Sequence, residues 1–186
     1  KDTIERAIQR GAGGLEGENL EEVSFEGYGP GGIAIIVESM TDNNNRTVAE
    51  VRHAFTKSGG NLGTNGSVSY LFEKKGLINI TPDQDADLIM EISIEAGAED
   101  IQVNEDDSIT VSSSPEDFEN IKNALLEKQI NLIDSDVALI PETTVKADID
   151  TSLKVFKLLE MLEDLDDTQN VTSNIEFAEG MLDHLD

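Results

Sequence analysis

The sequence predicts an α+β protein built from two small ferredoxin-like α/β-sandwich units, one inserted into the other. From residue 76 onward the predicted order is strand, helix, strand, strand, helix, strand, which is the split β-α-β plan. Apolar residues recur at helical spacing in some segments and alternate with polar ones in others. With 186 residues, of which 38% are apolar, the chain can bury a core in each unit.

The N-terminal elements follow from caps, glycines and alternation. A helix capped by Thr3 is expected first, and we expect residues 1–14 to be the end of a helical domain that lies upstream. Polar and apolar residues alternate over Glu22–Tyr28, which predicts a strand with one buried face. The glycine-rich turn 29–32 then leads into the β-branched run Ile33–Val37, which is expected to be a central strand.

A helix and a returning strand come next. Asn43 can cap a helix running from about residue 46 to residue 58, whose apolar side chains face inward. Gly59 and Gly60 should end this helix, because glycine readily adopts the conformation that stops one. The segment Ser67–Phe72 is predicted to return as a strand.

The inserted unit is expected over residues 76–144. Leucines at helical spacing after it predict a helix around residues 155–165, and Asn170–Glu176 should form a last strand. These two elements complete the first unit, so residues 15–75 and 145–186 should form one discontinuous domain. The predicted elements of the inserted unit are Leu77–Thr81, Asp85–Ala96, Asp100–Asn104, Ser108–Ser113, Pro115–Lys128 and Leu132–Ile140.

Charge divides the chain unevenly. Its net charge is -26, but residues 1–75 hold 8 basic and 11 acidic side chains, whereas residues 76–186 hold 5 and 28. The acidic part is either a solvated surface that keeps the protein soluble, or a nucleic-acid mimic or docking face for a basic protein. The absence of cysteine excludes disulfides, and no apolar run reaches the ~18 residues of a membrane span, so a cytoplasmic protein without a membrane partner is expected.

Several motifs fail as chemical sites. A strand rather than a helix follows the glycines of residues 27–32, so they do not form a dinucleotide site. Residues 83–87 resemble the start of a calcium loop but lack its glycine, and their aspartates are better helix caps. Residues 104–107 read as a hairpin turn, with a weak cation site as the alternative. The sequence predicts no catalytic residue, metal, cofactor or small-molecule substrate.

The helix near residue 50 is the candidate binding surface. Its basic residues fall on one stripe opposite the apolar ones. The loop after it has little side-chain bulk and is expected to offer free backbone amides to phosphate. The alternative is that Arg46 pairs with Glu50 and the glycines only permit tight turns. The candidate residues for binding nucleic acid or ribosomes are Arg46, Arg52, His53, Lys57, Gly59, Gly60, Asn61, Lys74 and Lys75.

The same region resembles a known family. DNNNRTVAEVRHAFTKSGGNLGTNGSVSYLFEKKG, residues 42–76, is similar along its whole length to a segment of the YebC/PmpR family, and weaker likeness continues through EAGAED, LIPETTV and LLEMLEDLDDTQNV. The resemblance implies two α+β domains preceded by a basic helical domain, which would lie before Lys1. Many relatives have arginine where this chain has Asn44, so a phosphate contact at this position is expected to be weaker or absent.

The resemblance also implies the function. Bacterial members are described as probable transcriptional regulators, and a mitochondrial relative activates translation of a cytochrome oxidase subunit. We therefore expect a non-enzymatic regulator of gene expression, a ribosome-associated translation factor that contacts ribosomal RNA, with basic ribosomal proteins meeting its acidic part. The alternatives are a DNA-binding transcriptional regulator, which needs a base-reading helix that residues 1–186 do not offer, and an enzyme with an unrecognised site.

Overall fold

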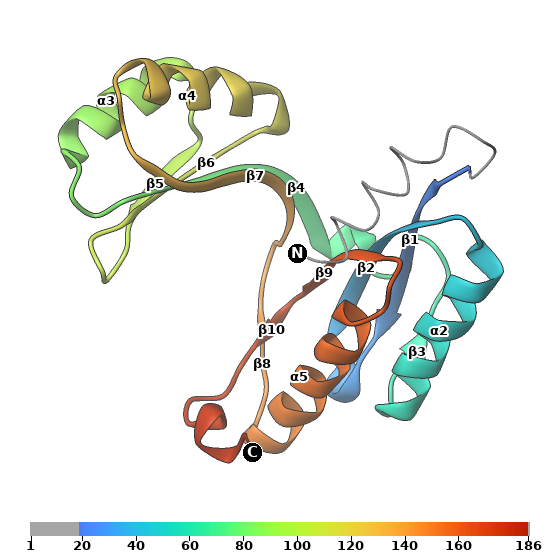
Figure 1. Cartoon of the computed structure of the whole chain (residues 1–186). Coiled ribbons are helices and arrows are strands. Elements are labelled where there is room, and N and C mark those ends of the chain that lie inside the picture. The colour runs from blue at the N-terminus through green and yellow to red at the C-terminus, as the bar shows by residue number, and fades with distance from the viewer. Residues whose placement is uncertain (1–18, 186) are drawn as a thin grey trace. The chain divides into compact units, whose positions relative to one another are not determined.

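Residues 19–185 are described in the computed structural model, and they form two compact units (Figure 1). The first unit combines the chain up to Phe72 with the chain from Pro141 onward, and the second unit spans Glu73–Ile140. Each has its own antiparallel sheet, helices and apolar core. The predicted α+β class, with one unit inserted into the other, is confirmed.

The sheet of the first unit has the order β3-β1-β2-β9. As predicted, β2 is central: it pairs antiparallel with β1 on one side and with β9 on the other. Ala34, Ile35, Ile36 and Val37 on β2 are all at most 3% exposed. The strands are β1 (Glu21–Tyr28), β2 (Ala34–Thr41), β3 (Asn61–Leu62) and β9 (Thr168–Ser173).

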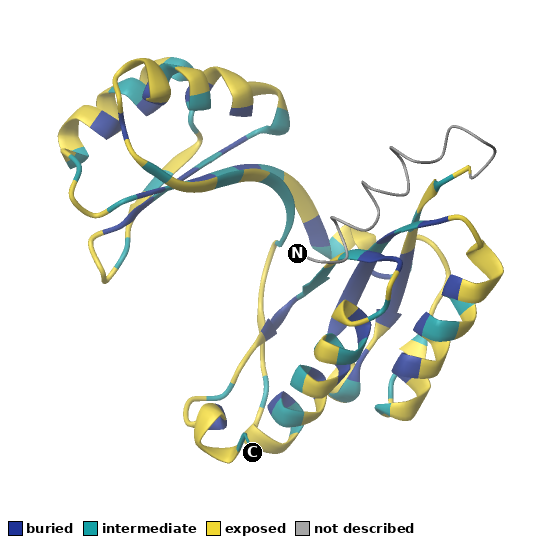
Figure 2. Cartoon of the chain, in the orientation of Figure 1, coloured by how far each residue is buried: buried dark blue, intermediate teal, exposed yellow. Residues whose placement is uncertain are grey.

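Helices α2 (Asn44–Lys57) and α5 (Ile149–Glu163) pack side by side against this sheet. Each helix begins at a capping side chain: Asn43 accepts a hydrogen bond from the Arg46 amide, and Asp148 accepts one from the Thr151 amide. The buried residues of the two helices, including Phe55 and Leu158, form one cluster with the sheet. Figure 2 shows this apolar stripe in dark blue on each helix.

The strand predicted over Ser67–Phe72 is wrong. Ser69–Leu71 is a 3-10 turn, β4 starts only at Phe72, and the short strand Asn61–Leu62 occupies the sheet edge beside β1. The reason is the carboxylate of Glu26, which accepts the amides of Val68 and Ser69 at 3.1 and 2.6 Å. Those amides are therefore not available to a sheet partner.

The last predicted strand, Asn170–Glu176, is interrupted. β9 ends at Ser173, and β10 (Ile175–Glu176) pairs parallel with β8 (Val145–Lys146) in a separate two-stranded sheet. Asn174, which is 5% exposed, divides the two strands. Its side-chain oxygen accepts the Ala34 amide at 2.9 Å and its own amide donates to the Ala34 carbonyl, so this residue ends the pairing with β2.

The second unit follows the predicted order of elements. Its sheet has the order β5-β6-β4-β7, and α3 and α4 contact each other over a core that includes Ile89, Ile121 and Leu125. Asp85 and Ser114 cap the two helices, as expected of the aspartate. The elements are β4 (Phe72–Ile80), α3 (Ala86–Ala96), β5 (Asp100–Val103), β6 (Ile109–Ser113), α4 (Pro115–Glu127) and β7 (Leu132–Pro141).

Candidate nucleic-acid interface

The outer face of α2 carries exposed basic side chains. Arg52, His53 and Lys57 are all exposed, and within residues 19–185 no ion pair involves Arg52 or Lys57. The stretch from residue 43 to residue 70 contains a single acidic residue, Glu50, in a chain of net charge -26. This face is therefore a local basic surface on an acidic protein.

The local sequence explains why these side chains face outward. Thr47, Val51, Ala54 and Phe55 are buried, and they recur at the spacing that places residues on one side of a helix. The basic residues occupy the positions between them and so face solvent. The predicted division of this helix into an apolar and a basic side is confirmed by the burial of its residues.

Arg46 differs from the other basic residues because it is held by two carboxylates. Its guanidinium lies 2.8 Å from Asp42 and 3.0 Å from Asp167. Arg46 donates to both carboxylates, and these hydrogen bonds, first the one to Asp167, raise the pKa of Arg46 above its ordinary value. The alternative weighed from the sequence had Glu50 as the partner, but the partners are Asp42 and Asp167.

Asp167 is the buried centre of this network. It is 1% exposed and accepts hydrogen bonds from the hydroxyls of Thr47 at 2.8 Å and Thr41 at 3.3 Å, in addition to Arg46. Burial alone would raise the pKa of Asp167, but the hydrogen bonds from Thr47, Arg46 and Thr41 lower it below the ordinary value. Arg46 therefore joins the start of α2 to the segment before β9, which is a structural role.

Gly59 and Gly60 close the helix. The Gly59 amide donates to the Thr56 carbonyl and the Gly60 amide to the Phe55 carbonyl, the pair of bonds that defines a Schellman cap. Gly59 has a φ of +84°, and a Cβ on Gly60 would lie 2.3 Å from the Tyr28 carbonyl oxygen. Both glycines are thus required by the helix end and by the close approach of β1.

The expectation of free amides in the following loop is largely wrong. The Gly63 amide donates to the Glu26 carbonyl at 2.8 Å, and the Gly66 amide donates to the Glu26 carboxylate at 2.7 Å. Asn61 lies in β3, which pairs with β1. Because these amides already have acceptors within the chain, basic side chains rather than loop amides are left to contact phosphate.

Two exposed aromatic residues near this loop were not singled out from the sequence. Tyr70 is 67% exposed and Tyr28 36% exposed, and the Tyr28 hydroxyl donates to the Ser67 carbonyl at 3.3 Å. Partial burial, with the hydrogen bond to Tyr70 and its charge, raises the pKa of Tyr28. An exposed tyrosine can stack on an unpaired base. The available signal was tyrosine inside a glycine-rich, uncharged stretch.

Lys74 and Lys75 belong to the second unit rather than to the unit that carries α2. Lys74 is exposed, whereas the ammonium group of Lys75 lies 3.5 Å from Glu99 and 3.8 Å from Glu73. Phe118 is the only aromatic residue between Glu73 and Ile140, and its ring is only 6% exposed. The sheet of the second unit therefore offers no aromatic platform for bases.

Residues 19–185 contain neither a cluster of metal-binding side chains nor a helix that could cross a membrane. Within that part of the chain, no group of three or more histidine, aspartate or glutamate side chains is placed to hold a metal ion. No helix in the described part is long and apolar enough to cross a membrane. The aspartates of residues 83–87 act locally: Asp85 caps α3, and hydrogen bonds from Thr81 and Gln84 lower the pKa of Asp83.

Comparison with known proteins gives matches over nearly the whole chain. A family described as "TACO1/YebC second and third domain" matches residues 20–175. A "probable transcriptional regulatory protein" of Francisella philomiragia is 56% identical over 185 residues, which cover 100% of this chain and 75% of that protein. A protein of the same description from Hahella chejuensis is 55% identical with the same coverage.

A solved structure supports the fold. The crystal structure of a conserved hypothetical protein from Aquifex aeolicus aligns with a TM-score of 0.80 and 47% sequence identity. The alignment covers 96% of this chain and 74% of that one. The arrangement of elements described above is therefore shared with an experimentally determined relative.

Proposed function

This chain belongs to the TACO1/YebC family, and from that premise we propose that it is a non-enzymatic regulator of gene expression that acts in the cytoplasm on the ribosome. The names of the relatives describe regulators, which favours nucleic acid as a partner. The observation that carries the proposal is the exposed basic face formed by Arg52, His53 and Lys57 on α2, set in an otherwise acidic chain.

The chemistry of this face suits a sugar-phosphate backbone. Arginine and lysine neutralise phosphates, and such contacts supply affinity without reading sequence. Arg52 and Lys57 are not engaged by carboxylates among the described residues, so they can pair with phosphate without breaking an existing ion pair. Arg46 supports the face from its network with Asp167 rather than by direct contact.

Ribosomal RNA fits this surface better than promoter DNA. Sequence-specific reading of DNA needs side chains that reach base edges in the major groove. The exposed stripe of α2 is basic, which favours contact with the sugar-phosphate backbone, and the same unit also exposes Tyr70, which can stack on an unpaired base. The acidic second unit, with 17 acidic and 4 basic residues from Glu73 to Ile140, would then face basic ribosomal proteins.

The second candidate function is DNA-binding transcriptional regulation. The observation that favours it is the description shared by the relatives from Francisella and Hahella. Both candidates use the same basic face, so they differ in the target and in how strongly the target's sequence matters. A specific DNA binder prefers its site by ~10³-fold or more over other DNA.

The first experiment measures binding of the chain to purified ribosomes and to genomic DNA fragments across a salt series. We expect co-sedimentation with ribosomes that survives excess DNA at physiological salt. Reversing both cations, Arg52→Glu with Lys57→Glu, should weaken ribosome binding strongly. Each phosphate contact removed should also reduce the slope of log affinity against log salt by about 1.

The matched control reverses two exposed lysines of α5, Lys154→Glu with Lys157→Glu, which changes the net charge equally on the neighbouring helix. If both double variants lose the same amount of binding, general charge rather than the α2 face is responsible. A strong preference for particular DNA fragments would replace the ribosomal proposal with the transcriptional one. A large fall in thermal stability of the α2 variant would show instead that its cations are structural.

A further inference from the structure

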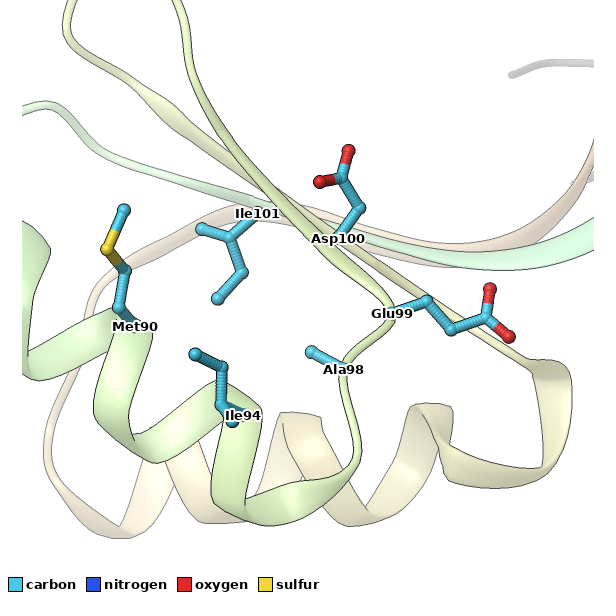
Figure 3. A pocket seen from close by; sticks show the side chains of 6 residues that line it. All are labelled: Met90, Ile94, Ala98, Glu99, Asp100 and Ile101. Carbon is cyan, nitrogen blue, oxygen red and sulfur yellow. The ribbon is translucent and has the colours of Figure 1, made fainter.

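The second unit has an apolar groove between α3 and β5 (Figure 3). Met90 and Ile94 line it from adjacent turns of α3, and Ala98 and Ile101 line it from the following loop and strand. The groove has a volume of about 270 Å³. Ile94 is 66% exposed and Met90 36% exposed, so packing within the second unit leaves this apolar surface open.

The groove lies next to an unpaired strand edge. Among residues 19–185, β5 is the outer strand of its sheet and pairs only with β6. The Asn104 amide donates to the Ser108 carbonyl at 2.8 Å, which fixes where hydrogen-bonded pairs fall along this antiparallel ladder. Because such pairs alternate, the backbone groups of Ile101 and Val103 point away from β6. They are free to pair with an added strand.

The side chains of β5 alternate in chemistry. Ile101 and Val103, the latter 48% exposed, face the same side as the groove, and Figure 3 shows the Asp100 carboxylate directed away from Ile101. A strand added along this edge would also point its successive side chains to opposite faces of the sheet. Every second side chain of that strand would enter the groove, and the intervening ones would lie on the side of Asp100.

Charge decides which kind of segment fits. Acidic residues stand at both ends of β5: Glu99 before it and Asp100 at its first position, and the hairpin Glu105–Asp107 after it. The hairpin is held by its own hydrogen bonds, since Ser108 donates to Asp106 and this lowers the pKa of that carboxyl. A second copy of this acidic edge would be repelled by like charge, whereas a basic segment would be attracted.

We propose that the edge of β5 and the groove beside it bind an extended segment of a basic protein, in which apolar side chains alternate with lysine or arginine. Backbone pairing with Ile101 and Val103 would fix its register, and its apolar side chains would cover Met90 and Ile94. The inference deepens the proposed contact with basic ribosomal proteins and rests on it for the source of the segment. Its test uses no ribosome, so the two proposals fail separately.

The test is fluorescence anisotropy of a short labelled, terminally blocked peptide of alternating lysine and valine, titrated with the full chain. We expect saturable binding that Ile94→Lys weakens about tenfold or more, because the exposed anchor of the groove becomes a like charge for the peptide. The matched control is Leu126→Lys, at a side chain of α4 that is 48% exposed and does not line the groove, and its affinity should stay within about twofold.

Two further peptides separate the contributions of charge and shape. An alternating glutamate and valine peptide should not bind, and an alternating lysine and serine peptide should bind much more weakly than the valine one. Val103→Lys, on the strand edge β5, repeats the test should Ile94→Lys unfold. Equal affinity for the valine and serine peptides, unchanged binding in both variants, or a wild-type dimer that Ile94→Lys dissociates would overturn the proposal.

Discussion

Two buried carboxylates organise the first unit at the scale of single residues. Asp167 receives Arg46 and two threonine hydroxyls, and Glu26 receives the amides of Gly66, Val68 and Ser69. A buried carboxylate is tolerated only when its oxygens are fully hydrogen-bonded, and both of these are. Glu26 thereby fixes the segment 66–69 beside β1, and Asp167 joins the start of α2 to the segment before β9.

The dependence of the protein's stability on pH should reflect the ionisation of the Glu26 carboxyl. Burial alone would raise the pKa of Glu26, but three backbone amides lower it below the ordinary 4.5. A lowered pKa in the folded state adds stability above pH 4.5, and this stability is lost as the pH falls through the folded value. Glu26→Gln should therefore lower the free energy of unfolding at neutral pH by roughly 2 kcal/mol, with a smaller difference in acid.

Urea unfolding of both proteins over a pH series measures this difference. Glu22→Gln is the matched control, since Glu22 is exposed on the same strand, and its difference from the wild type should be close to zero throughout. A gap between wild type and Glu26→Gln that stays constant with pH would mean that shape, not charge, accounts for the effect.

At the scale of elements, the glycines at the end of α2 have two competing explanations, one in packing and one in ligand binding. The glycines after the helix could serve either a phosphate or the fold, and the structure gives each a place in the Schellman cap. The helix end is then positioned against β1, because Gly60 approaches the Tyr28 carbonyl and Asn61 pairs with Tyr28. The exposed stripe of α2 is held rigidly by this arrangement.

Alanine substitutions should distinguish the two glycines. Gly59→Ala places a side chain at a φ of +84° in open space, so we expect a loss of about 1 kcal/mol. Gly60→Ala puts a Cβ 2.3 Å from a backbone oxygen, which β1 can relieve only by moving, so a larger loss of at least about 2 kcal/mol is expected. Chemical denaturation measures both.

Ribosome binding of the Gly59→Ala variant completes this comparison. If the glycine serves only the helix end, the variant should co-sediment with ribosomes like the wild type at a temperature where it is folded. A loss of binding without a loss of structure would mean that the loop contacts the ribosome. It would contradict the conclusion that the loop amides serve hydrogen bonds within the chain.

At the scale of the whole molecule, the chain combines two units that expose different surfaces. Both units are acidic overall, but the first has the basic face of α2, whereas the second has an open apolar groove. Their cores share no residue. The two segments of the first unit that flank the inserted unit lie next to each other, because the Glu142 amide donates to the Leu71 carbonyl at 3.0 Å.

Excision of the second unit tests this independence. Replacing Glu73–Ile140 by a short glycine-serine linker should leave a chain that still unfolds cooperatively, because the core of the first unit stays complete. Circular dichroism during heating checks the fold. The shortened chain should keep binding that depends on Arg52 and Lys57 and should lose the lysine-valine peptide. Non-cooperative melting would show that the two units stabilise each other.

Much of this architecture was predictable from the sequence because its signals are local. Periodicity identified the helices and the split plan of the second unit, and capping side chains such as Asn43 and Asp85 marked helix starts. Spacing alone placed Arg46, His53 and Lys57 on one stripe of the helix, with Arg52 beside it. These features depend on residues that are close together in the sequence, so the sequence alone is enough to predict them.

The tertiary structure decided the rest, because the deciding contacts join distant segments. Arg46 meets Asp167, 121 residues later in the chain, and so has a structural partner that no spacing could indicate. Glu26 collects amides that are 40 or more residues away and thereby replaces a predicted strand with a turn. A carboxylate can accept from any donor that folding brings near, so the sequence by itself determined the elements and the basic stripe, and only the folded chain determined which charged groups remain available to a partner.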